Sequence, residues 1–199
     1  MKGVIRTKVG YTGGESSDPT YRKLGGHAEA IQIDYDPEDV SYADLLEVFW
    51  KGHNPHSRPF SSQYRNAIFY HDDKQKKLAI ESKEMIEKED GAKVHTDISR
   101  MKRFYRAEDY HQKYYMQREN KIMKELKSAY PSFRGVVDST AAARINGYLG
   151  GNGSCEMLEA DVYRLGLSKK TAEAFLIRIC GSSQIGACEG DETRCAANE

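Results

Sequence analysis

The fold is decided by residues 27–50, which read HAEAIQIDYDPEDVSYADLLEVFW. Polar and apolar residues alternate over the first nine positions, a pattern typical of a β-strand whose two faces differ. Asp36 and Pro37 end this strand. Ser41, followed three positions later by Asp44, is an N-cap signal, and the apolar residues that follow recur with helical spacing. The stretch therefore predicts a strand followed by an amphipathic helix that packs on a sheet.

Strand and helix signals continue on both sides of this stretch. A glycine pair at positions 13 and 14 ends an earlier alternating run. A charged amphipathic pattern further on predicts a second helix, with Met85 on its inner stripe. We therefore expect an α+β fold, a two-layer arrangement with a ferredoxin-like sheet and helices packed around that one sheet. The additional predicted elements are strands at 4–11, 66–70 and 93–98 and a helix from 72 or 73 to about 89.

The second half of the chain differs because helical segments replace the alternating ones. Ser154 and Ser168 lie where N-caps are expected. Helices are predicted at 119–128, 139–148, 155–165 and 169–180. We divide the chain into an α+β core at 1–116, a helical C-terminal extension at 117–180 and a flexible, cysteine-containing tail at 181–199.

Composition excludes several classes of protein. The 199 residues contain 30 basic and 30 acidic side chains, so the formal net charge is zero, whereas a nucleic-acid-binding protein normally carries a basic patch. No apolar run approaches the roughly 18 residues that span a membrane. All 4 cysteines lie in the last quarter of the chain, too few and too unevenly placed for a disulfide framework. We therefore expect no nucleic-acid partner, no membrane association, and a reducing, cytoplasmic location.

Glu29 is the candidate site residue that the strand pattern supplies. It shares one strand face with Ile31, Ile33 and Tyr35. Burial on such a face makes ionisation costly, so its pKa is expected to rise from about 4.3 toward 6 or 7, where it could donate a proton at neutral pH. The alternative is a strand glutamate paired with His27 or with an arginine.

Tyr21 and Tyr64 each follow a turn-like stretch. Their hydroxyls could donate hydrogen bonds to a developing oxyanion without carrying charge. The chain contains 13 tyrosines, so packing is the alternative role for each. His53 and His56 form a His-x-x-His pair, but zinc needs two further ligands, and we expect no metal and no cofactor.

Three cysteines could carry redox chemistry. Cys180, Cys188 and Cys195 are spaced along the C-terminal segment, where a thiol can reach a distant partner and form a disulfide. Exposed thiols without a role are the alternative. Cys155 opens a predicted helix, whose N-terminus could lower its pKa, or it is an ordinary first-turn residue.

A series of short motifs runs through the first 116 residues. The motifs are VGYTGG (9–14), PTY (19–21), GHAEA (26–30), YDP (35–37), SYADLLEVFW (41–50), QYR (63–65), AIFY (67–70), FY (104–105) and AEDYHQ (107–112). In this order they resemble peptide methionine sulfoxide reductases of the A type. The resemblance implies reduction of the S epimer of methionine sulfoxide, free or in proteins, by a cysteine or selenocysteine, with thioredoxin or a similar thiol reductant restoring the enzyme. Such activity repairs proteins under oxidative stress.

The resemblance also assigns roles to individual residues. Glu29 matches the proton donor of the family, and Tyr21 and Tyr64 match its two phenols that bind the sulfoxide oxygen. Two features depart from the family. The Gly-Cys-Phe-Trp-Gly motif, which holds the nucleophile and precedes the VGY strand in relatives, is absent, and residues 59–63 lack the aspartate that braces the phenols.

We therefore expect an N-terminally incomplete chain, as would result if a selenocysteine codon led to a start at the next methionine. Such a chain is expected to be poorly stable and nearly inactive, with Cys180, Cys188 or Cys195 serving as the resolving thiol only in the complete protein. One alternative is a non-catalytic binding or interaction module that keeps the sulfoxide pocket. Another is that the helical half is a docking domain for a partner and the first half its scaffold.

Overall fold

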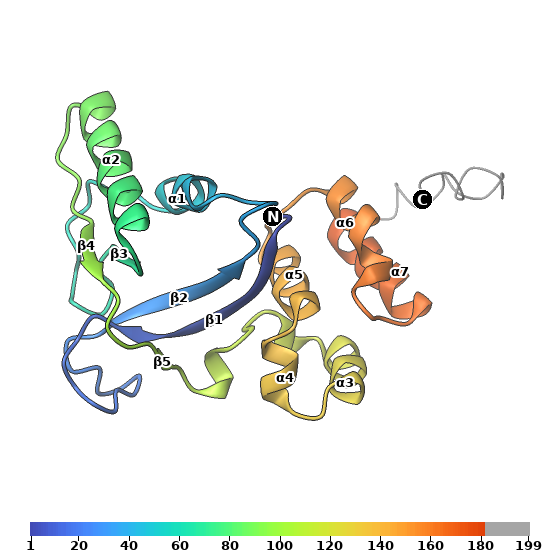
Figure 1. Ribbon diagram of the computed structural model, residues 1–199. Helices are drawn as coiled ribbons and strands as arrows, with labels where there is room; N and C mark the ends of the chain where they lie inside the picture. Colours follow the sequence, from blue (N-terminus) through green and yellow to red (C-terminus); the bar gives the residue numbers. More distant parts are fainter. Residues whose placement is uncertain (182–199) are drawn as a thin grey trace. The chain divides into compact units, whose positions relative to one another are not determined.

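A computed structural model describes residues 1–181 of the chain. The chain divides into two compact units, Met1–Lys113 and Tyr114–Glu199 (Figure 1). We call them the N-terminal unit and the helical unit. Every described strand lies in the N-terminal unit, which also holds two long helices, whereas the described part of the helical unit contains helices only. The expected α+β class with C-terminal helices is confirmed.

A three-stranded antiparallel sheet forms the base of the N-terminal unit, with strand order β2-β1-β5. Strand β1 (Val4–Thr12) pairs with β2 (Ala28–Tyr35) on one side and with β5 (Tyr105–Arg106) on the other. Tyr11 lies near the end of β1, directly opposite Glu29 of β2, and its side chain is only 2% exposed. The register therefore fixes Glu29 beside a buried part of the sheet.

Strands β3 (Ala67–Tyr70) and β4 (Asp97–Arg100) form a separate, two-stranded parallel sheet. The prediction of one sheet is therefore wrong for the described residues, because no described strand joins the outer edge of β2 to the outer edge of β3. The predicted strand at 93–98 is also displaced toward later residues. Its first part pairs with a loop instead, since the His95 N–H donates to the Pro55 carbonyl at 2.8 Å.

Helix α1 (Tyr42–Lys51) begins where the sequence predicts. The Ser41 side chain accepts a hydrogen bond from the Asp44 N–H at 3.1 Å, and the Asp44 carboxylate accepts one from the Ser41 N–H at 2.8 Å, which completes a capping box. Leu46 and Trp50 point from the helix into a core that also contains Ile68 of β3. The pattern of caps and apolar residues thus places α1 correctly.

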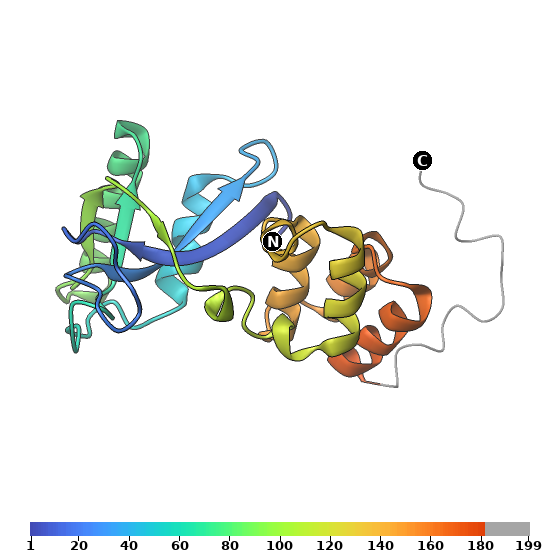
Figure 2. The same cartoon turned by 90° about the horizontal axis from the view of Figure 1, so that it is seen from below.

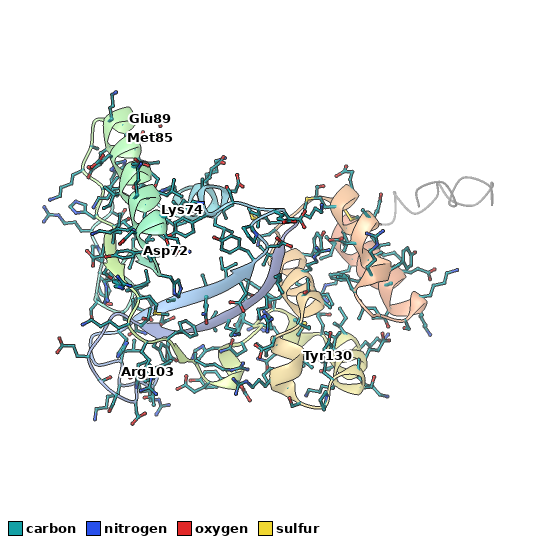
Figure 3. All side chains as sticks on the ribbon, in the orientation of Figure 1. Asp72, Lys74, Met85, Glu89, Arg103 and Tyr130 are labelled. Carbon is teal, nitrogen blue, oxygen red and sulfur yellow. A yellow bond between two sulfur atoms is a disulfide. The ribbon has the colours of Figure 1, made fainter. Side chains whose placement is uncertain are left out.

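Helix α2 (Asp73–Asp90) connects β3 to β4 and packs on them through Ala79, which is fully buried. Met85 is 58% exposed, so its predicted place on the buried stripe is wrong. Figure 3 shows Met85 and Glu89 in the half of α2 that is distant from β1 and β2, and at this level of the helix Ile86, not Met85, packs on the core.

The helical unit has one continuous core, to which each of its described α-helices contributes. Figure 2 shows these helices gathered together. Ser154 and Ser168 cap their helices as predicted, each accepting a hydrogen bond from the backbone N–H three residues later. The sequence prediction missed α4. The helices are α3 (Asn120–Ala129), α4 (Phe133–Val137), α5 (Thr140–Leu149), α6 (Cys155–Asp161) and α7 (Lys169–Cys180), with 3-10 turns at Met116–Arg118 and Val162–Arg164; a further 3-10 turn, Asp109–His111, belongs to the N-terminal unit.

A disulfide joins Cys155, the first residue of α6, to Cys180, the last residue of α7, with the two Cα atoms 5.6 Å apart. Cys180 is thus paired in this structure, because α6 and α7 bring the two sulfur atoms together, and its role as a resolving thiol stays a prediction. Cys188 and Cys195 lie outside the described residues. None of the helices in the described part of the chain is long and apolar enough to cross a membrane.

Candidate functional site

The three predicted site residues form one cluster in the N-terminal unit, although they are far apart in the sequence. The hydroxyl oxygens of Tyr21 and Tyr64 are 3.4 Å apart. The side-chain amide nitrogen of Gln63 lies 2.6 Å from a carboxylate oxygen of Glu29 and 3.2 Å from the Tyr64 hydroxyl. Gln63 therefore links the acid to the two phenols.

The loop that carries Tyr64 is fixed to the edge of β2. The Glu29 N–H donates to the Gln63 carbonyl at 3.1 Å. The Arg65 guanidinium donates to the carbonyls of Gly26 and Ser62 at 3.0 and 2.7 Å, which ties the loop to the turn that precedes β2. These bonds hold Tyr64 beside Glu29 by main-chain as well as side-chain contacts.

The loop that carries Tyr21 leaves β1 through a glycine that no other residue can replace without strain. Gly13 has a φ of 82°, and an added Cβ would lie 2.5 Å from the Phe69 ring. His27 closes the other end of this loop, since its ring nitrogens lie 3.2 Å from the Gly14 nitrogen and 3.0 Å from the Ser16 carbonyl oxygen. His27 is thus engaged by the loop, and the alternative in which it pairs with Glu29 is wrong.

Glu108 holds Tyr21 from the opposite side. One oxygen of its carboxylate accepts a hydrogen bond from the Tyr21 N–H at 3.2 Å, and the other accepts one from the buried Tyr11 hydroxyl at 2.6 Å. Partial burial acts to raise the pKa of Glu108, but the bonds from Tyr11 and the backbone outweigh it and lower that pKa. The Tyr21 ring also packs on His111, with centroids 4.8 Å apart.

The structure contradicts the expected burial of Glu29. Its side chain is exposed, and Ile31 on the same strand is 58% exposed. The expectation assumed that the whole of this face packs against another element, but only Ile33 and Tyr35 are half-buried, and the end of the strand with Glu29 and Ile31 is exposed. A cavity of about 330 Å³ lies over the strands at this point, lined by Glu29 and Ile31 together with Tyr11 and His111.

The cluster offers an acid and two neutral hydrogen-bond donors to a substrate oxygen. The neighbouring Tyr21 hydroxyl, and then partial desolvation and the charge of Glu29, raise the pKa of Tyr64, so its phenol stays protonated at neutral pH. Neutral phenols can stabilise negative charge that develops on an oxygen, and a carboxylic acid can protonate it. Residues 1–113 contain no cysteine, so this unit supplies no thiol nucleophile.

The two histidines of the His-x-x-His pair are engaged separately. His53 Nδ1 lies 2.8 Å from the Phe49 carbonyl oxygen. His56 has both ring nitrogens occupied, by Asp90 at 2.8 Å and by the Lys93 carbonyl at 3.0 Å. Within residues 1–181, no group of three or more histidine, cysteine or acidic side chains is arranged to hold a metal ion.

A family model described as peptide methionine sulfoxide reductase matches residues 1–152. The chain belongs to the peptide methionine sulfoxide reductase family. A second model, described as the helical domain of selenoprotein methionine sulfoxide reductase A, matches residues 136–176. The first match spans the residues of the cluster, and the second lies within the helical unit, which is similar to that helical domain.

Individual members of the reductase family match over much of the chain. A Drosophila melanogaster peptide methionine sulfoxide reductase is 41% identical over 169 residues, which cover 84% of this chain and 68% of the relative. The Methanosarcina mazei enzyme is 48% identical over 126 residues, 58% of this chain and 60% of the relative.

Solved structures of reductases share the fold. Reduced Mxr1 from Saccharomyces cerevisiae gives a TM-score of 0.55 at 30% identity and covers 59% of this chain and 73% of its own. Methionine sulfoxide reductase A of Corynebacterium diphtheriae gives 0.52 at 25% identity and covers 59% and 65%. Across these four proteins, this chain therefore spans between 60% and 73% of the relative's length.

Sequence reasoning gave no role to three residues that contact the cluster: Gln63, Glu108 and His111. Gln63 is adjacent to Tyr64, and its position in a reductase motif was the only available signal. Glu108 and His111 come from a motif more than 80 positions after Tyr21, and the pairing of β5 with β1, together with bonds from Ala107 and Gln112 to Val9, brings that motif close.

Proposed function

We propose that this protein reduces methionine (S)-sulfoxide, free or in proteins, to methionine, as part of the repair of oxidised proteins. The observation that carries the proposal is the cluster of one carboxyl and two phenols, Glu29, Tyr21 and Tyr64, within a chain of the reductase family. These are the groups that a sulfoxide oxygen requires, because it accepts hydrogen bonds before the reaction and a proton during it.

In the proposed reaction, the Tyr21 and Tyr64 hydroxyls donate hydrogen bonds to the sulfoxide oxygen and withdraw electron density from the sulfur. A thiolate or selenolate attacks that sulfur while Glu29 gives its proton to the oxygen. The hydroxyl group then passes to the nucleophile, which becomes a sulfenic or selenenic acid, and methionine leaves with its thioether restored. The substrate is reduced by two electrons and the nucleophile is oxidised by two.

Thiols complete the cycle in this proposal. A second thiol attacks the sulfenic or selenenic acid, and a disulfide or selenenylsulfide forms with release of water. Thioredoxin or a similar dithiol reductant then reduces that bond. Cys188 and Cys195 are our candidates for the second thiol, and Cys180 joins them once its disulfide with Cys155 is reduced.

The attacking group has to come from outside the N-terminal unit, because residues 1–113 contain no cysteine. The exposure of Glu29 and Ile31 supports a further segment, carrying the nucleophile, that covers this strand face. Such a cover would exclude water from the cluster and favour the protonated form of the acid. The present chain is accordingly expected to bind the sulfoxide without reducing it.

A turnover assay tests the assignment of the nucleophile. The purified chain is incubated with a peptide that contains methionine sulfoxide and with dithiothreitol, and methionine is quantified by mass spectrometry. We expect no turnover above the rate without protein. Turnover that is lost when Cys155, Cys180, Cys188 or Cys195 is replaced by serine would show that a thiol of this chain is the nucleophile.

A binding assay tests the substrate. N-acetylmethionine methylamide is titrated as its S-sulfoxide and as its R-sulfoxide, and binding is followed by NMR. We expect about a tenfold preference for the S epimer, which corresponds to ~1.4 kcal/mol. Equal affinities would contradict the proposed function.

A second candidate function follows from the lack of a cysteine in residues 1–113. The chain would then be a binding module that retains the sulfoxide pocket and recognises oxidised proteins without repairing them. Selective sulfoxide binding, combined with no turnover when the chain is expressed together with the coding sequence upstream of it, would favour this module over the reductase.

We also propose a cytoplasmic location. Cysteine usage alone does not support it, because Cys155 and Cys180 form a disulfide. Cytosolic disulfides are chiefly transient and take part in catalysis or redox sensing, so in that compartment we expect thioredoxin-type reductants to open this one. Alkylation of acid-quenched cells should label both cysteines in a substantial fraction of the protein.

A further inference from the structure

We propose that Gln63 is a positioning residue that fixes Glu29 and Tyr64 in the orientation that the reaction needs. This inference rests on the proposed function and goes beyond it, because it assigns a role to a residue outside the acid and the two phenols. Gln63 contacts two of those three residues directly, with its amide nitrogen 2.6 Å from Glu29 and 3.2 Å from the Tyr64 hydroxyl.

The chemistry of an amide suits this double contact. The NH₂ group has two donor hydrogens, so it can serve the carboxylate and the phenol oxygen at the same time. It also does not ionise, and therefore adds no charge that would compete with the substrate. The bond to an ionised Glu29 is charge-assisted and stronger than one between neutral groups.

The contact with Tyr64 determines where the phenol hydrogen points. The Tyr64 oxygen accepts a hydrogen bond from the Gln63 amide, so one lone pair of that oxygen is engaged on the Gln63 side. Its own O–H is then directed elsewhere, and the Tyr21 hydroxyl at 3.4 Å marks that direction. A sulfoxide oxygen placed between the two phenols would receive a hydrogen bond from each.

The contact with Glu29 stabilises the carboxylate that remains after proton transfer. After the acid gives its proton to the sulfoxide oxygen, it is a carboxylate, and the Gln63 amide is a donor already in place for that charge. The main chain fixes the same pair, because the Gln63 carbonyl accepts the Glu29 N–H at 3.1 Å. Residues 59–63 lack the aspartate expected from the family loop, and Gln63 supplies the bracing there.

The surrounding bonds allow Gln63 to be changed without loss of the loop. Arg65 holds the loop through the Ser62 and Gly26 carbonyls, and neither bond involves the Gln63 side chain. The main-chain bond from Glu29 is also kept in side-chain substitutions of Gln63, because its acceptor is the backbone carbonyl of residue 63. A loss of function in Gln63 variants would therefore report on the amide and not on the fold of the loop.

The first test follows the Gln63 side-chain amide by ¹H–¹⁵N NMR in the full chain. Its signals are assigned by their loss in Gln63→Glu, and their shifts are recorded as pH is lowered through the range in which carboxyl groups titrate. We expect these shifts to follow the titration of Glu29 and to stay flat in Glu29→Gln. Shifts that are insensitive to pH in the wild-type chain would overturn the proposal.

The second test measures function by ligand discrimination, which a purely structural role would not change. The probes are the S-sulfoxide of N-acetylmethionine methylamide and the corresponding thioether. Gln63→Ala and Gln63→Glu should each weaken sulfoxide binding about tenfold, the loss expected when a hydrogen bond to a charged group is removed, and leave thioether binding and the melting temperature unchanged. Gln32→Ala is the matched control. It makes the same change on β2, beyond Glu29, and should retain wild-type discrimination.

The two tests separate this inference from the proposed function. If the wild-type chain prefers the sulfoxide and Gln63→Ala keeps that preference, Gln63 is not a positioning residue, although the function stands. If the wild-type chain shows no preference while the Gln63 signals still follow Glu29, the substrate is wrong and the bracing contact is real.

Discussion

The two units of the chain differ in how completely their apolar surfaces are covered. The helical unit buries one continuous core, in which Ile145, Leu158 and Val162 have no exposed surface. The N-terminal unit has two smaller clusters, and it leaves Ile31 exposed on the strand face that carries Glu29. The stable packing of this chain is thus concentrated in the helical unit, whereas the candidate chemistry lies in the unit whose covering is least complete.

This difference shows why the site is recognisable although Glu29 is exposed. The cluster is held by hydrogen bonds that Gln63 and Arg65 donate and by one that Glu108 accepts from Tyr21, and none of these bonds needs a covering layer. Burial of the acid, by contrast, needs a segment packed on the strand face. Positioning of the side chains and desolvation of the site therefore have separate structural origins in this protein.

The largest difference in stability between the two units is expected when a cavity is made in the helical core. Ile145→Ala should destabilise the helical unit by about 2–5 kcal/mol, because Ile145 is fully buried. The same change at Ile31 should alter stability by less than about 0.5 kcal/mol, since that side chain is mostly in water. Differential scanning calorimetry measures both. Equal destabilisation by the two variants would show that the strand face of Ile31 is covered.

Reduction of the disulfide comes next in size. The Cys155–Cys180 bond closes a segment with a sequence separation of 25, and loss of such a crosslink costs about 3 kcal/mol of stability in the loop-entropy account. Cys180→Ser should therefore lower the midpoint of chemical unfolding of the helical unit. Dithiothreitol should have the same effect on the wild-type chain and none on the variant; an unchanged midpoint would mean that the crosslink does not stabilise this unit.

A smaller effect is expected for Glu108 in the N-terminal unit. Because its folded-state pKa is lowered, its contribution to stability is fully present above the unfolded value of 4.5 and is lost as pH falls through the folded value. Glu108→Gln should cost about 1 kcal/mol at pH 7 by weakening the bonds to Tyr11 and Tyr21. In urea unfolding, the difference between variant and wild type should be smaller at pH 3 than at pH 7. A cost of equal size at both values would indicate a packing role.

The smallest effect concerns His56, whose side chain is 27% exposed. The Asp90 carboxylate raises the pKa of His56, so the stability gained from this pair is complete below the unfolded value of 6.5 and is lost as pH rises through the folded value. NMR titration of the imidazole should give a lower pKa in Asp90→Asn than in the wild-type chain. An unchanged value would mean that the pair does not persist in solution.

Local features of the fold were predictable because their causes lie within a few residues. The capping box of Ser41 and Asp44, and the caps of the last two helices by Ser154 and Ser168, follow from side-chain hydrogen bonds over three positions. The alternating strands up to β3 were likewise placed correctly. The strand pattern supplied Glu29 as a candidate, whereas the roles of Tyr21 and Tyr64 came from the resemblance, since a lone tyrosine has no local pattern that separates binding from packing.

Non-local features could not be predicted in the same way. The division into two sheets depends on which strand edges pair, and the disulfide between Cys155 and Cys180 depends on how α6 meets α7. The exposure of Glu29 was missed because alternation shows that a strand has an apolar face, but not what covers that face. The contact between Glu108 and Tyr21 spans 87 positions and leaves no periodic signal.

The most direct test of the central claim is the affinity of the chain for the S-sulfoxide of N-acetylmethionine methylamide in the double variant Tyr21→Phe, Tyr64→Phe. The substitutions remove the two hydroxyls that lie 3.4 Å apart and leave the rings in place. We predict at least a tenfold loss of affinity for the sulfoxide and no change for the thioether. Equal affinity of variant and wild type for the sulfoxide would contradict the assignment of this cluster as a sulfoxide-binding site.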